Sequence, residues 1–184
     1  MLALPQMFVA NGSVIYVGVV GTTSAIIIAA GICVLMAALE GLCAGKNVKS
    51  FYAELRFPRY SAPLWVWTII GGVYYVIFWF VLCRLLLMES RSTLWFSAFA
   101  LILFMMILNA LTNYVIFRAR NIGLSFFVTC VFPLLDVALF VYLLRLNKLA
   151  AWSLIPYLMY RVYSVWWGYR LWQLNRMPRS EISR

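Results

Sequence analysis

The sequence contains no histidine, and only 5 acidic and 15 basic side chains occur in 184 residues. Without histidine the chain lacks the commonest metal ligand and the usual general base, so we expect no metal site and no cofactor held by histidine. The four cysteines fall singly in hydrophobic segments without CxxC spacing, which excludes a zinc site or a disulfide scaffold. A soluble protein of this length would be about 25% charged. This chain therefore has too few charges to cover a surface that faces water.

Hydrophobic residues make up 66% of the sequence, and they gather in five runs long enough to cross about 30 Å of hydrocarbon. Alternation with a period of two is absent, so helices are the expected spanning structure. The sequence predicts an all-α fold, namely one domain over residues 1–184 that forms an integral membrane bundle of five transmembrane helices. The predicted spans are residues 14–42, 65–88, 94–117, 124–144 and 149–171.

The basic residues are distributed unequally between the two sides of such a bundle. Five crossings place ten of them on the side of the C-terminus: Lys46, Lys49, Arg56, Arg59, Arg118, Arg120, Arg170, Arg176, Arg179 and Arg184. The opposite side carries four: Arg84, Arg91, Arg145 and Lys148. The positive-inside rule predicts a cytoplasmic C-terminus and an N-terminus outside. Because the cations are spread over several loops, we expect a lipid bilayer and not a nucleic acid as the partner of this charge.

Small residues recur at every fourth position along most of the first span. This ridge consists of Gly21, Ala25, Ala29, Cys33, Ala37, Gly41 and Gly45. Small side chains let helices approach closely in lipid. The ridge is explained either by packing within the bundle or by a homodimer contact.

Two ionisable residues, Asp136 and Arg161, each lie about twelve residues into a predicted span. Similar depths in consecutive antiparallel helices allow the two side chains to meet. Because either charge alone is costly at the bilayer centre, we expect an intramembrane ion pair. The pair has a structural role, or it takes part in charge movement or in binding an anionic ligand.

Polar and aromatic side chains also line single faces of the predicted helices. Asn109, Thr112 and Asn113 share one face, and Tyr160, Ser164 and Trp167 share another. Amides are costly in hydrocarbon unless paired, so these faces are expected to point inward. The last span holds seven tyrosines and tryptophans, more than two interfacial belts require. Some of them should line the interior.

Three segments carry a resemblance to a known family. FYAELRFPRYSAPLW at residues 51–65, followed by Tyr75, resembles the WYxxLxKPxWxPPxW...LY signature of the TspO/MBR family, the translocator proteins or peripheral-type benzodiazepine receptors. Residues 108–120 resemble its LNW...FFxAR stretch, and residues 156–175 resemble its PYLxW...NYxxWxxN ending. Order and spacing agree over about two thirds of the chain.

This chain departs from the family pattern at several positions. Phe57 stands where the family has a lysine, and Tyr60, Gly71 and Tyr160 stand where it has tryptophans. The tryptophan-rich stretch after the helix-three asparagine is ALTNY at residues 110–114. The chain resembles a divergent member.

The resemblance implies a five-helix membrane protein that binds porphyrins, sterols or drug-like molecules in a pocket capped by the first loop. It places a ligand pocket around Trp65, Tyr75, Asn109, Tyr157, Tyr160, Ser164 and Trp167. Tyr169 and Arg170 occupy the family's C-terminal sterol motif, although its usual basic residue is Gln173 here. The family occurs in the outer mitochondrial membrane and in bacterial cell membranes.

We therefore expect a membrane receptor or carrier for a hydrophobic small molecule such as a porphyrin or a sterol. A structural or assembly subunit of a membrane complex is the alternative from another class. Porphyrin breakdown by tryptophan chemistry is a further alternative, but Gly71 and Tyr160 replace the tryptophans it would use, so we do not expect an enzyme.

Overall fold

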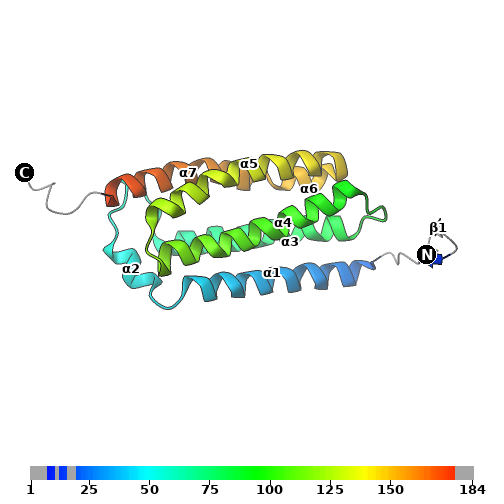
Figure 1. The fold of residues 1–184 in the computed structure, drawn as a ribbon, viewed down its shortest axis with the longest axis horizontal. Coiled ribbons are helices and arrows are strands. Elements are labelled where there is room, and N and C mark those ends of the chain that lie inside the picture. Colours follow the sequence, from blue (N-terminus) through cyan, green and yellow to red (C-terminus); the bar gives the residue numbers. More distant parts are fainter. Residues whose placement is uncertain (1–7, 11–12, 16–19, 177–184) are drawn as a thin grey trace, which may run out of the picture.

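The computed structural model describes residues 8–10, 13–15 and 20–176. Among these residues the fold is all-helical apart from a short antiparallel pair of strands, β1 (Phe8–Ala10) and β2 (Ser13–Ile15). Five long helices lie side by side (Figure 1): α1 (Thr22–Ala44), α3 (Leu64–Leu86), α4 (Thr93–Asn113), α5 (Ile122–Leu146) and α7 (Ile155–Asn175). Two short helices, α2 (Val48–Glu54) and α6 (Lys148–Ser153), lie at opposite ends of the bundle. A π-helical turn, η1 (Tyr114–Arg118), continues α4.

The helices differ from the predicted spans in two places. The first helix begins at Thr22 and not at residue 14, because Gly21 has an extended backbone (φ −61°, ψ 152°) and Val14 pairs with Val9 in the strand pair. The run predicted at residues 149–171 is divided between α6 and α7, with Leu154 between them. Pro156 lacks the N–H that would continue the hydrogen bonding of α6 into α7.

Polar residues begin several of the helices. The side chains of Ser92, Asn121 and Asn147 accept hydrogen bonds from backbone N–H groups in the first turns of α4, α5 and α6, at 3.3, 2.9 and 3.0 Å respectively. Each bond satisfies a donor that has no partner within its helix. These caps fix where the chain turns back into the bundle.

The long helices form a ring around the centre of the molecule. Helix α1 packs against α3 and α4, α4 packs against α5, and α5 packs against α7. Between α3 and α7 the ring is closed largely by aromatic side chains, such as Trp67 of α3 against Trp167 of α7, with ring centroids 4.6 Å apart. The centre of the bundle between these two helices is therefore lined by side chains and not by closely packed backbones.

The first half of the small-residue ridge packs inside the bundle. Ala25, Ala29 and Cys33 are buried, and the Cys33 thiol lies 3.7 Å from the carbonyl oxygen of Tyr75 on α3. Ala37 and Gly41, further along α1, are exposed. Packing within the bundle accounts for the ridge as far as Cys33 and again at Gly45, where a Cβ atom would lie 2.8 Å from the Arg118 side chain.

The outer surface of the bundle is apolar. Large side chains that are more than half exposed point outward from every long helix, for example Val34, Val76, Phe104, Leu134 and Val162. Within the described residues, α1, α3, α4 with η1, and α5 are long and apolar enough to cross a membrane. Helix α7 is less apolar because it contains four tyrosines, three tryptophans and two arginines.

Candidate functional site

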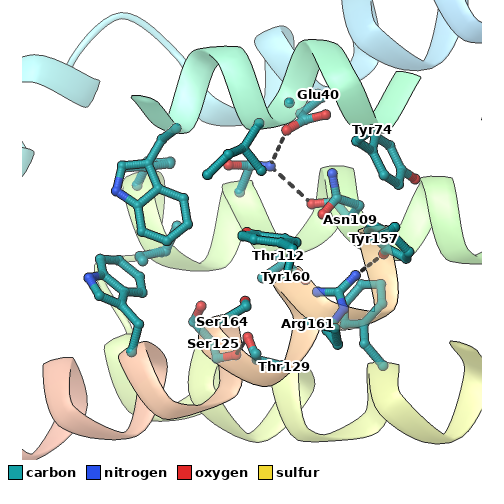
Figure 2. Close-up of a pocket in the computed structure, with 18 of the residues that line it drawn as sticks. Glu40, Tyr74, Asn109, Thr112, Ser125, Thr129, Tyr157, Tyr160, Arg161 and Ser164 are labelled. Carbon is teal, nitrogen blue, oxygen red and sulfur yellow. Dashed lines mark hydrogen bonds between the residues drawn. The ribbon is translucent and has the colours of Figure 1, made fainter. Parts of the chain in front are cut away.

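A cavity of about 220 Å³ lies inside the ring of helices. All five long helices contribute to its walls, and η1 and Tyr52 of α2 complete them (Figure 2). Eight of its lining residues are aromatic: Tyr52, Trp67, Tyr74, Phe117, Phe132, Tyr157, Tyr160 and Trp167. Eight others are polar or charged: Glu40, Asn109, Thr112, Asn113, Ser125, Thr129, Arg161 and Ser164. The cavity therefore offers aromatic surface together with groups that can fix the orientation of a ligand.

Aromatic rings of α3 and α7 form one continuous wall of the cavity. The indole of Trp67 stacks on Tyr163 at 6.1 Å and meets Tyr160 edge-on at 6.2 Å. One end of this wall continues into Tyr74 and Tyr157, whose centroids are 5.5 Å apart. Such contacts contribute about 0.5–1.5 kcal/mol each beyond the area they bury, so the wall is ordered without backbone contact between the two helices.

Gly71 leaves a gap in the same wall. It lines the cavity, and a Cβ atom built on it would meet no heavy atom within 4 Å. The space next to Gly71 is therefore open to a ligand.

Glu40 of α1 provides the acidic group of the cavity. Its carboxylate accepts hydrogen bonds from the Tyr75 hydroxyl at 2.7 Å and from the Asn113 amide at 2.8 Å. Asn113 also donates to the backbone carbonyl of Asn109, one turn earlier in α4. Both partners of the carboxylate are neutral, and no basic side chain pairs with Glu40 among the described residues.

Arg161 of α7 lies across the cavity from Glu40 (Figure 2) and is paired with Asp136 of α5. Its Nε lies 3.0 Å from Asp136 Oδ2, and another guanidinium nitrogen donates to the Tyr157 hydroxyl. The guanidinium carbon lies 4.3 Å from the ring centroid of Phe132. Asp136 is 1% exposed and Arg161 is 7% exposed. The two charges therefore compensate each other in a region without solvent.

The connection between α2 and α3, residues 55–63, is attached to α7 at one end of the cavity. Asn175 accepts from the Arg56 N–H and donates to its carbonyl, both at 3.0 Å. Further along, the Tyr163 hydroxyl accepts from the Ala62 N–H, and the Trp167 indole donates to Ser61 at 2.8 Å. These bonds position Tyr52 and Trp67, which flank this connection and line the cavity.

Five of the seven residues that the sequence places around a ligand line this cavity: Asn109, Tyr157, Tyr160, Ser164 and Trp167. Trp65 and Tyr75 do not, and Trp65 is 64% exposed. Successive side chains of an α-helix are rotated by about 100° about its axis. On α3 the side chains that face the cavity are therefore Trp67 and Tyr74. Tyr75 points toward Glu40 instead, and Trp65 points outward.

Tyr169 and Arg170, the residues of the possible sterol contact, lie outside the cavity. Both are exposed on α7, where Gln173 donates to the Tyr169 hydroxyl at 2.6 Å and accepts from Arg170 at 3.1 Å. They form a polar group on the outer surface of the bundle.

Sequence reasoning missed several residues of the site, above all Glu40. The sequence did contain a signal for Glu40, because a single acidic residue in an otherwise uncharged apolar run is costly in a membrane unless it is paired or has a function. Trp67 carried no specific signal, because aromatic residues recur along the whole of α3. Tyr74 carried no signal of its own, because the family pattern includes its neighbour Tyr75 and not Tyr74.

Comparison with known protein families identifies the fold. The TspO/MBR family model matches residues 29–173, which is most of the chain and includes the cavity from Glu40 to Trp167. The chain belongs to the TspO/MBR family. No curated protein matches it. As a TspO/MBR protein with four strongly apolar helices, it is an integral membrane protein in contact with the lipid bilayer. Family membership supports a general role in binding or transporting a ligand at the membrane.

Proposed function

We propose that this TspO/MBR protein is a receptor or carrier that binds a hydrophobic small molecule, such as a porphyrin or a sterol, in the central cavity. The observation that carries the proposal is the lining itself, which combines eight aromatic side chains with eight polar or charged ones inside the bundle. A flat apolar body would lie between the aromatic wall of α3 and α7 and the facing helices. Asn109 would bind a polar end of the ligand.

The size of the cavity adds a condition. Sites for drug-sized ligands usually enclose roughly 300–1,000 Å³, whereas this cavity encloses about 220 Å³. A porphyrin or a sterol therefore requires the cavity to widen. The boundary between α3 and α7 is the favoured place, because side chains rather than closely packed backbones hold it together.

The membrane arrangement is part of the proposal. Helix α7 would be a fifth crossing, in which the aromatic and ionic groups face the cavity. The excess of basic residues then places the C-terminus in the cytoplasm, in a cell membrane or in the outer mitochondrial membrane. A homodimer would use the exposed part of the ridge near Ala37 and Gly41.

The test is the melting temperature of the detergent-solubilised protein as a function of protoporphyrin concentration, with a sterol titrated in parallel. Ligands that bind the native state raise this temperature in a saturable way. Trp167→Ala should abolish the rise, because Trp167 lines the cavity. Trp166→Ala should keep it, since the neighbouring Trp166 is 40% exposed and is not part of the lining.

An unrelated helical membrane protein in the same micelles is the second control. If both ligands raise its melting temperature equally, they only partition into the micelle. The proposal fails in that case, and it also fails if both tryptophan variants respond like the unchanged protein.

A further inference from the structure

The charged groups of the cavity do not balance. Three ionisable side chains, Glu40, Asp136 and Arg161, lie in or directly behind its walls. Arg161 is compensated by Asp136 at 3.0 Å, so this pair adds no net charge. Glu40 is bound only by a hydroxyl and an amide. The carboxylate of Glu40 therefore leaves one negative charge without a counter-ion among the described residues.

This carboxylate is placed to accept more hydrogen bonds. An ionised carboxylate has about four lone-pair sites, and Tyr75 and Asn113 use two of them. The Tyr74 hydroxyl, in the same wall, is buried and has no hydrogen-bond partner among the described residues. Because that hydroxyl is fully buried, the Glu40 carboxylate is the acceptor that a donor entering the cavity would meet.

The aromatic rings of the cavity also favour a positively charged ligand. The faces of Trp, Tyr and Phe attract cations, more strongly where water is excluded. The arginine already uses this attraction, because its guanidinium carbon lies 4.3 Å from the Phe132 ring centroid and 4.8 Å from that of Tyr157. Trp67, Tyr74 and Tyr160 offer further rings to an incoming cation.

We propose that the cavity selects an organic cation, a compact aromatic amine whose ammonium group binds Glu40. This inference rests on the proposed binding function and names the class of ligand. The amine donates to the free lone pairs of the carboxylate, and its apolar body lies in the space beside Gly71. A compact body fits without the widening that a porphyrin or a sterol requires, because about 220 Å³ is less than drug-sized ligands usually occupy. Among compact ligands an anion is disfavoured, because Asp136 already compensates the charge of Arg161.

The test compares three indole compounds that share one ring system and differ in charge: tryptamine, its neutral analogue tryptophol, and the anion indole-3-acetate. Affinities are measured by isothermal titration calorimetry on the full chain in detergent micelles at pH 7. Tryptamine should bind at least ten times more tightly than tryptophol, and indole-3-acetate should bind most weakly. Equal affinities for tryptamine and tryptophol in the unchanged protein overturn the inference without any variant.

Substitutions then test whether Glu40 produces the preference for tryptamine over tryptophol. Glu40→Gln keeps the size of the side chain and should reduce the preference for tryptamine to less than threefold, whereas Glu40→Asp keeps the charge and should keep the preference. Glu89→Gln is the matched control, because Glu89 is exposed at the far end of α3. A preference that survives Glu40→Gln also overturns the inference. If Glu40→Gln does not fold, the unchanged protein and Glu40→Asp decide the question.

A cavity-filling variant separates this inference from the proposed function. Gly71→Leu should weaken the binding of all three compounds by at least tenfold, because its side chain fills open space in the cavity. If the compounds bind equally and all are lost in Gly71→Leu, the cavity is a binding site without charge selection, and only the cation inference falls. If none of them responds to Gly71→Leu, the proposed function falls with it.

Discussion

Arg161→Met removes the guanidinium from the buried pair and leaves the Asp136 carboxylate without a hydrogen-bond donor among the described residues. Two unit charges about 4 Å apart attract each other by roughly 4 kcal/mol at an effective dielectric constant of 20. Removing one partner of a buried pair typically costs about 3–5 kcal/mol, because the other charge is then buried alone. For a chain of this length that loss lowers the melting temperature by on the order of 10 °C.

The second variant in this experiment removes both charges. Asp136→Leu combined with Arg161→Met should recover most of the lost stability, because no unpaired charge remains. Thermal unfolding in one detergent is the assay, and Arg170→Met is the control, because Arg170 is exposed on the same helix. The coupling between the two sites should reach several kcal/mol. A double variant no more stable than Arg161→Met alone would refute the reasoning, since the two charges would then not depend on each other.

Two further predictions concern the wall and the end of the cavity. Gly71→Leu should not lower the melting temperature, because a Cβ atom at this position meets no atom within 4 Å and the substitution gains up to about 1 kcal/mol of helix propensity. A large fall, with Gly72→Leu as the control outside the cavity, would mean that the space beside Gly71 cannot hold the leucine side chain. Asn175→Ala should speed hydrogen exchange at the Arg56 amide, whose acceptor it removes. Gln173→Ala should leave this exchange rate unchanged, and equal rates in both variants would contradict the role assigned to Asn175.

Hydrophobic length was enough to predict the all-helical membrane fold, because crossing a bilayer imposes one strong requirement on each segment. The ends of the helices were less predictable. Gly21, Thr22 and Ser24 are residue types common at a helix N-terminus, but hydropathy does not separate them from the apolar run that begins at residue 14. The break between α6 and α7 depends on one proline, Pro156. Hydropathy alone also did not separate α6 from α7, because the apolar residues 149–152 of α6 run on into those of α7 with only Ser153 between them.

The site was predictable where a polar residue had to face inward, as for Asn109 and Ser164, which both line the cavity. Residues predicted from the family pattern are divided, since Tyr157 lines the cavity and two others do not. Trp65 and Tyr75 matched the family pattern, yet their neighbours on α3 line the cavity instead. The pattern fixes which segment lies near the site, whereas the rotation of the helix about its axis decides which side chain enters it, and packing against α1 and α7 sets that rotation.

Residues that set this chain apart from the family pattern meet in the cavity. Gly71 and Tyr160 replace tryptophans and both line it, so it has more room and one more hydroxyl than the pattern would give. Glu40 faces the same space and receives two hydrogen bonds without gaining a counter-ion. Together these features place free volume and a carboxylate without a counter-ion in one cavity with aromatic walls. A ligand that fills this volume and carries a positive charge satisfies both features at once, whereas a neutral one would leave the carboxylate without a counter-ion.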